Sequence, residues 1–117
     1  MTKEAQAELG RQLIEEIRAS FARGDWDGTT GIYEQISGLK TDRAIRLEAT
    51  CLTARALVAA KQRPAARQLV KSLEKNEYKK PAHYEFLARA YLDLKQYKNA
   101  AKACERAEEL RLEQEEK

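Results

Sequence analysis

The stretch PAHYEFLARAYLDLKQYKNAAKACERAEELRL, from Pro81 to Leu112, decides the fold that we expect for the whole chain. Its apolar residues recur at steps of three and four, the spacing that places side chains on one face of an α-helix. They form two sets, which are Tyr84, Leu87, Ala88 and Tyr91, and then Ala100, Cys104 and Ala107. Small residues at 88 and 100 are expected where two helices cross closely, because a larger side chain there typically costs about 1–3 kcal/mol. The stretch therefore predicts two antiparallel helices that pack as a hairpin.

This hairpin resembles the tetratricopeptide repeat (TPR), a helix–turn–helix unit with aromatic, leucine and small residues at fixed places. The matching residues are Tyr84, Ala88, Tyr91 and Ala100. Two residues depart from the family pattern, since Cys104 is smaller than the usual aromatic residue and Leu112 replaces the closing proline. The last helix is therefore expected to continue toward the C-terminus.

The same pattern occurs about one TPR period earlier in the chain. ARALVAAKQRPAARQLVKSL, from Ala54, aligns without a gap with ARAYLDLKQYKNAAKACERA, from Ala88. A third unit is indicated by the turn-like segment Gly24–Asp27, which places Ile17 opposite Ala54 and Thr29 opposite Ala66. Its step to the next unit is three residues longer, and we place the extra residues near positions 43–46. The chain thus reads as three repeats.

We predict an all-α fold, a TPR-like right-handed superhelix of about six antiparallel helices in a single domain over residues 1–117. The hairpins are expected at about 2–39, 41–75 and 81–115. The first helix is expected from Thr2 to Arg23, and the second after Asp25. The third should run from Thr41 or Asp42 to about Lys61, and the fourth from Pro64 to about Lys75. The fifth should start at Pro81 and the sixth at about Tyr97. The polar connector from Asn76 to Lys80 is expected to be exposed.

The sequence contains no recognisable targeting or membrane-spanning segment. The first residues contain no apolar run of the kind found in signal peptides, and no later segment has the length and hydropathy of a membrane span. We therefore expect a cytoplasmic protein that does not insert into a membrane. Cys51 and Cys104 lie in different repeats and are interpreted as structural thiols.

No pattern of catalytic or metal-binding residues is present. His83 is the only histidine, it is expected at the surface, and two scattered cysteines do not complete a usual zinc set. Glycine-rich phosphate loops and nucleophile motifs are absent. The sequence predicts a protein that is not an enzyme and needs no cofactor or metal.

The TPR resemblance implies that the first helix of each unit lines a concave groove that binds peptides. Arg18, Arg55 and Arg89 directly follow the aligned residues Ile17, Ala54 and Ala88. If the repeats stack, these arginines form a ladder that suits carboxylates, and apolar residues one helical turn further on supply anchors. The candidate groove residues are Arg18, Phe21, Arg55, Val58, Arg89 and Leu92. The alternative is that the arginines pair with Glu15, Glu85 or Asp93 and only solvate the groove.

The resemblance does not extend to the carboxylate clamp with which some TPR co-chaperones hold the tails of heat-shock chaperones. The clamp positions hold Ile14, Arg18, Leu52, Ala82 and Phe86 here, and only Arg18 is positively charged. We therefore predict a different ligand.

A second basic surface is predicted on the fourth helix. Residues 41–80 carry ten basic and four acidic side chains. Arg63, Arg67, Lys71 and Lys75 recur there at every fourth residue, a spacing that forms one stripe along a helix. A solvated outer face explains this stripe, and phosphates of nucleic acids or acidic lipids are the alternative. Because no aromatic residues are interleaved for base stacking, nucleic acid is the less favoured ligand.

The sequence thus predicts a non-enzymatic protein-protein interaction adaptor that binds an acidic or carboxylate-terminated segment of a partner. A self-associating TPR module is the first alternative, and nucleic-acid binding through the basic stripe is the second.

Overall fold

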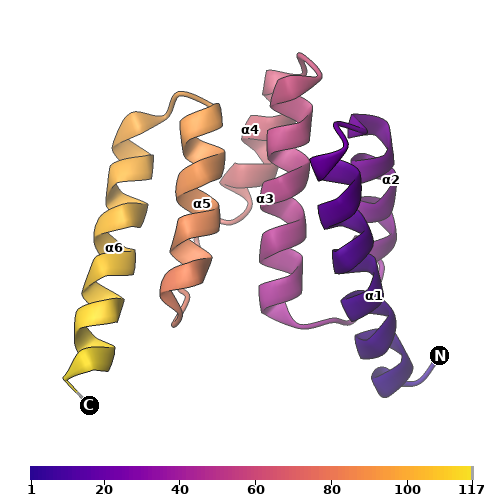
Figure 1. Cartoon of the computed structure of the whole chain (residues 1–117), viewed down its shortest axis with the longest axis horizontal. Coiled ribbons are helices and arrows are strands. Elements are labelled where there is room, and N and C mark those ends of the chain that lie inside the picture. Colours follow the sequence, from indigo (N-terminus) through magenta and orange to yellow (C-terminus); the bar gives the residue numbers. More distant parts are fainter. Residues whose placement is uncertain (117) are drawn as a thin grey trace.

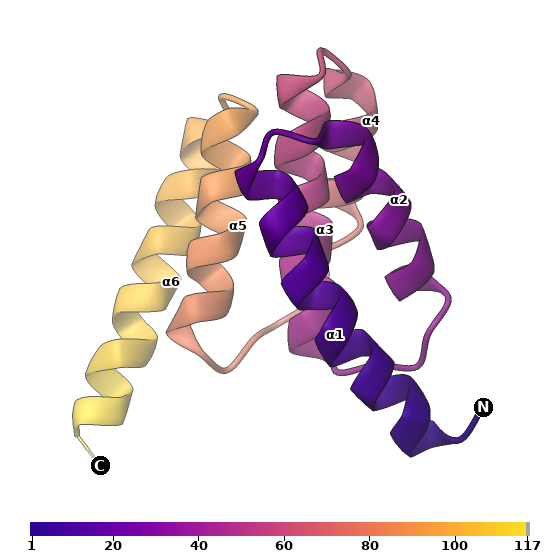
Figure 2. The same cartoon turned by 45° about the vertical axis from the view of Figure 1, so that its right-hand side comes forward.

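The computed structural model describes residues 1–116, and within that range it contains six α-helices and no strand (Figure 1). The helices are α1 (Lys3–Ala22), α2 (Trp26–Ser37), α3 (Arg43–Ala59), α4 (Arg63–Lys71), α5 (Pro81–Asp93) and α6 (Tyr97–Glu115). α3 lies between α1 and α5 and contacts both, while α2 and α4 lie behind this row in the view of Figure 1. α6 stands beside α5 at the end opposite α1 and α2 (Figure 2). The predicted all-α class and number of helices are confirmed.

The helix starts follow from capping residues in the sequence. The side chains of Thr2, Asp25 and Asp42 accept hydrogen bonds from backbone N–H groups in the first turns of α1, α2 and α3, at 3.0, 3.0 and 3.1 Å. Such caps satisfy N–H groups that have no partner inside the helix. Pro81 begins α5, where its missing N–H costs no helical hydrogen bond. The predicted starts of these helices are confirmed.

One turn geometry joins the two helices of each pair. Gly24, Lys61 and Lys95 all have a positive φ, of 75°, 67° and 62°. The N–H of the residue that follows each of them donates to a carbonyl five residues back, at distances of 3.0, 2.8 and 2.9 Å. This pattern is the Schellman motif, which ends a helix with one left-handed residue. The three positions are those that the sequence alignment places opposite one another.

The core lies where the small residues recur. Ala54, Ala66, Ala88 and Ala100 are all buried, as their alignment predicted. In the first pair Ile17 and Thr29 take the equivalent places and are fully buried. The Thr29 hydroxyl lies within hydrogen-bonding distance of the Ser20 hydroxyl, 3.2 Å, and donates to the Asp25 carbonyl oxygen at 2.9 Å. A threonine is therefore accommodated where the other pairs use alanine.

α4 is shorter than the sequence suggested. It ends at Lys71, so Lys75 lies outside it and the predicted end at about Lys75 is wrong. The Ser72 hydroxyl donates to the Leu69 carbonyl oxygen at 2.6 Å, and the following N–H groups bond three residues back. Such local bonds compete with the α-helical pattern and tighten the chain into turns. Leu73 remains buried although it follows the helix.

The connector between α4 and α5 is not exposed throughout. Tyr78 is only 5% exposed and belongs to the main hydrophobic cluster, which corrects the prediction for 76–80. Its N–H donates to the Tyr84 hydroxyl at 3.1 Å, and its ring meets that of Tyr84 edge-on with centroids 5.7 Å apart. Because α4 is short, this tyrosine covers part of the core that a longer helix would cover.

The sequence pattern predicts Cys104 on the buried face of Ala100 and Ala107, but in the structure Cys104 is exposed to solvent. Ala103 is buried in its stead. In the preceding pair the aligned residue is Val70, which is buried in the cluster that also contains residues of α5. Within residues 1–116 no helix follows α6 to cover the equivalent face. The prediction failed because it treated the last pair as an internal one.

Candidate partner-binding surface

The three predicted groove arginines lie on α1, α3 and α5, the row of helices that faces the viewer in Figure 1. Each directly follows a residue of the buried core, namely Ile17, Ala54 or Ala88. This register is fixed by the core, since a one-residue shift on a helix turns a side chain by about 100°. The arginines therefore occupy equivalent places on their helices.

Arg18 joins α1 to α3. Its Nε and Nη2 atoms donate to the two carboxylate oxygens of Glu48, both at 2.6 Å, in the two-pronged geometry that arginine favours. Glu48 is buried, whereas the Arg18 side chain is about half exposed. The hydrogen bonds to Glu48 raise the pKa of Arg18. Glu48 is not among the predicted surface residues, although its place seven residues before Arg55 puts both on one face of α3.

Arg55 joins α3 to both neighbouring helices. Its Nε donates to an Asp93 oxygen of α5 at 2.9 Å, and its guanidinium lies 4.9 Å from the ring centroid of Phe21 in α1. Asp93 is one of the acidic partners that the alternative prediction proposed for these arginines. A cation over an aromatic ring adds an attraction of about 0.5–1 kcal/mol at exposed sites. Arg55 thus helps to hold the three helices in place.

Arg89 differs from the other two arginines. It is exposed, and within residues 1–116 it forms no ion pair. Glu85, proposed above as a possible partner, pairs instead with Arg111 of α6. Two of the three arginines are therefore held by carboxylates of the chain, and Arg89 is left open to solvent.

The predicted apolar anchors also differ in exposure. Phe21 is half-buried, with its ring centroid 5.5 Å from that of Trp26, and Val58 is half-buried against the core. Leu92 is 50% exposed. The exposed arginine and the exposed leucine thus lie three residues apart on α5, where helical spacing places them on neighbouring positions of one face.

Two cavities formed by residues 1–116 lie away from the predicted groove residues. One of about 460 Å³ is lined by residues of α2, α3 and the segment after α4, including Arg43, Arg46 and Tyr78. Another of about 500 Å³ lies between α2 and α4. None of the six predicted groove residues lines either cavity. The arginine-bearing face of α1, α3 and α5 therefore contributes none of these six side chains to the two cavities.

The second predicted surface is shorter than expected. Arg63, Arg67 and Lys71 lie on α4, and Lys75 lies beyond its end. Arg67, Lys71 and Lys75 are exposed, and Arg63 is partly buried. The stripe is therefore a three-residue patch on the helix, followed by a lysine in the turn.

Residues 1–116 contain no group of three or more histidine, cysteine or acidic side chains placed to hold a metal ion. His83 is partly buried rather than at the surface, with its ring 5.6 Å from that of Tyr78, and burial lowers its pKa. No helix within this part of the chain combines the length and apolar character needed to cross a bilayer.

The two cysteines are both free thiols and differ in environment. Cys51 is buried on α3, and burial raises its pKa to about 12. Cys104 is exposed on α6. Since the thiolate is the reactive form, Cys51 is expected to be inert in the folded protein.

A thiol-specific chromogenic reagent is therefore expected to modify one thiol per folded chain at low protein concentration, and two in urea. Cys104→Ser should reduce the count in the folded state to zero, whereas Cys51→Ser should leave it at one. Raising the pH from 7 to 9 should not make Cys51 reactive, because its pKa lies above that range and the thiol stays protonated. Rapid modification of Cys51 in the folded chain would contradict the assigned burial.

Comparisons of the chain with models of protein families, with curated proteins and with solved structures gave no match.

Proposed function

We propose that the chain is a TPR-like array of three helical hairpins that acts as a non-enzymatic protein-interaction adaptor. It binds an extended or helical segment of a partner across the face of α1, α3 and α5, and the segment is acidic or ends in a free carboxylate. The single observation that carries this proposal is Arg89, an exposed arginine that forms no ion pair among residues 1–116 and lies at the register of Arg18 and Arg55.

The TPR-like arrangement is supported by features that recur in all three helix pairs. Each pair has one residue in the left-handed conformation at the turn, namely Gly24, Lys61 or Lys95, and the N–H of the next residue donates to a carbonyl oxygen five residues back. Small or fully buried residues lie at the aligned crossing points of each pair. In repeat arrays, equivalent residues on successive units form a continuous surface. We therefore propose that the arginine register forms one such surface.

The chemistry of the expected ligand follows from the arginine N–H groups that are not used in bonds within the chain. A guanidinium group has five N–H donors. Arg18 uses its Nε and Nη2 atoms for Glu48, and Arg55 uses its Nε atom for Asp93, so both keep N–H groups for a ligand. A carboxylate of the chain already pairs with each of these two guanidinium groups, whereas Arg89 has no such partner among residues 1–116. A ligand carboxylate is therefore expected to bind Arg89 first, with an apolar ligand side chain on Leu92.

The test compares two charge reversals on different faces. A fluorescent peptide rich in aspartate and glutamate, with a free C-terminal carboxylate, is titrated with the protein at low salt. We expect Arg89→Glu to weaken binding at least about tenfold, the equivalent of roughly 1.4 kcal/mol. Arg67→Glu on α4 makes the same change in net charge and should bind like the wild type. Arg55→Glu is a poorer choice, because it would also place a glutamate beside Asp93.

Two outcomes of this titration would contradict the proposal. One is no saturable binding of the acidic peptide to the wild type. The other is an equal loss in Arg89→Glu and Arg67→Glu, because binding would then depend on net charge and not on this surface. Strong salt-dependent retention on heparin, lost in Lys71→Glu/Lys75→Glu, would instead favour the basic patch of α4.

A further inference from the structure

Each helix pair has a second helix, which is α2, α4 or α6. Of these three, α6 is covered by the fewest neighbouring helices within residues 1–116. α2 contacts both α1 and α3, and α4 contacts both α3 and α5. Among the helices of residues 1–116, α6 contacts α5 alone. The face equivalent to the one that Val70 buries in α4 carries the exposed Cys104 in α6. One face of α6 is therefore open along its length.

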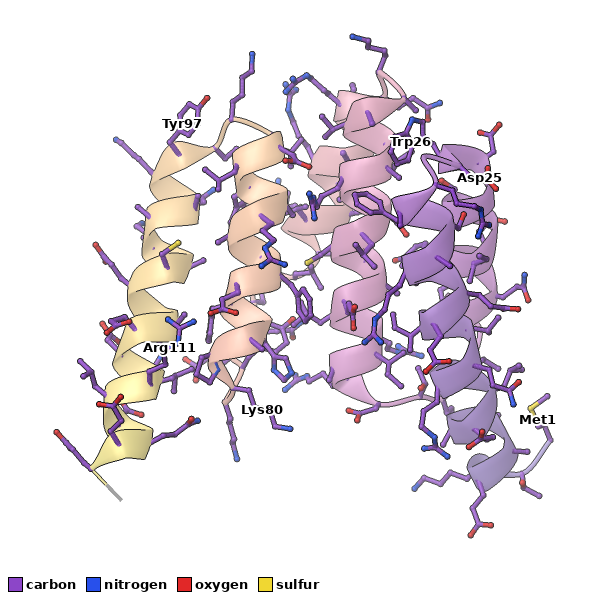
Figure 3. All side chains as sticks on the ribbon, in the orientation of Figure 1. Met1, Asp25, Trp26, Lys80, Tyr97 and Arg111 are labelled. Atoms are coloured by element: carbon purple, nitrogen blue, oxygen red, sulfur yellow. The ribbon has the colours of Figure 1, made fainter. Side chains whose placement is uncertain are left out.

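Exposed apolar residues follow this open side. Tyr97 is 63% exposed and Leu112 is 50% exposed, and Figure 3 shows Tyr97 at the start of α6, away from α5. Ala101 and Cys104 are also exposed and lie between them. Positions 97, 101, 104, 108 and 112 are spaced by four, three, four and four residues, which forms a single stripe on a helix. Glu108 is the only charged member, and Arg111 donates to its carboxylate at 3.4 Å.

Charges beside this stripe are separated by sign along the helix. Lys98 and Lys102 come first, and Glu105 and Glu109 follow at the same three- and four-residue steps. Neither lysine forms an ion pair within residues 1–116, whereas Glu109 already accepts a hydrogen bond from Arg106 at 2.9 Å and would be shared with a partner lysine. The acidic end of α6 lies at the negative end of its own dipole, which is unfavourable. An antiparallel helix beside it would bring a positive dipole end and positive side chains to that place.

We propose that α6 binds α6 of a second copy of this chain in an antiparallel pair, with the two-fold axis close to Cys104. This register places Tyr97 of one copy opposite Leu112 of the other. It also places Lys98 opposite Glu109, Lys102 opposite Glu105, and Cys104 opposite the same residue. The second copy is the occupant because the apolar residues and charges of α6 complement themselves when the helix is reversed, as a two-fold interface requires.

The first experiment measures mass by light scattering on the reduced full chain, from low micromolar to several hundred micromolar concentration. The mass should rise toward twice that of one chain. Leu112→Glu should raise the dimer dissociation constant at least tenfold. Leu92→Glu is the matched control, since Leu92 is equally exposed and lies on α5, and it should dimerise like the wild type. The mass of a single chain at all concentrations, or equal effects of the two variants, would overturn the proposal.

The second experiment tests the register. Lys98→Glu should weaken the dimer, and the added Glu109→Lys should restore it, because the two residues are too far apart on one helix to contact each other. A short bismaleimide should link two wild-type chains through Cys104. The Cys51→Ser variant should be linked to the same extent, and the Cys104→Ser variant should not be linked. Failure of the charge reversal to restore the dimer, or linkage without Cys104, would contradict the antiparallel pair. Arg89→Glu should leave the dimer intact, so this test is separate from that of the proposed partner surface.

Discussion

Tyr78→Ala is expected to lower the free energy of unfolding by about 3 kcal/mol or more, the usual range for removing a buried aromatic side chain. Tyr78 is 5% exposed and packs edge-on against Tyr84 and His83. Its hydroxyl also accepts a hydrogen bond from the Asn76 amide at 3.3 Å. The substitution therefore leaves a cavity where the connector closes the core between α4 and α5. Urea unfolding followed by circular dichroism measures the change.

Tyr97→Ala is the matched control for this prediction. Tyr97 is the same residue type but 63% exposed, so its removal should change the free energy of unfolding by no more than about 0.5 kcal/mol at low protein concentration. Similar destabilisation by both variants would contradict the buried role of Tyr78.

Gly10→Ala is expected to destabilise the protein by about 1–3 kcal/mol through overpacking. A Cβ atom at Gly10 would lie 2.3 Å from the Thr41 hydroxyl oxygen and 3.0 Å from the Thr41 Cβ. Thr41 lies in the segment that leads into α3, so the glycine lets that segment approach α1. Helix propensity alone predicts the opposite effect, since replacing glycine by alanine inside a helix typically raises the free energy of unfolding by about 1 kcal/mol. Thermal and urea unfolding distinguish the two signs.

Gly31→Ala supplies the control of opposite sign. No other side chain or backbone lies within 4 Å of a Cβ atom at Gly31 in α2. The substitution should therefore show only the helix-propensity effect and stabilise the protein by about 1 kcal/mol. A stabilising effect at both glycines would show that Thr41 does not lie against Gly10.

The helices could be predicted because their signals are local and repeated. Capping residues such as Asp25 and Asp42 mark helix starts, and small residues such as Ala54 and Ala88 recur one repeat apart. A residue that recurs at the same place in each unit tends to meet the same neighbours. The alignment therefore predicted burial of four alanines on four different helices.

The errors arose where neighbours differ between units. Cys104 has no following helix to cover it within residues 1–116, and Tyr78 is buried because α4 ends early at Lys71. At that end the Ser72 hydroxyl bonds the Leu69 carbonyl oxygen, a local bond that competes with the helix and that hydrophobic periodicity does not register.

For the candidate surface, the sequence predicted the equivalent positions of the three arginines but not their ion-pair partners. The alignment placed Arg18, Arg55 and Arg89 at equivalent positions, but ion pairs depend on single residues of neighbouring helices. Arg18 meets Glu48, Arg55 meets Asp93, and Arg89 meets neither kind of partner within residues 1–116. Repeat position alone does not distinguish these environments, because each arginine follows a core residue and precedes an alanine.

The most direct test of the proposed surface is a map of backbone amide chemical shifts by nuclear magnetic resonance during titration with the acidic, carboxylate-terminated peptide. We expect the largest changes to cluster on α5 around Arg89 and Leu92 and to extend to α3 around Arg55 and Val58. Changes confined to α4 and the turn after it, or no change at saturating peptide, would contradict the proposed surface.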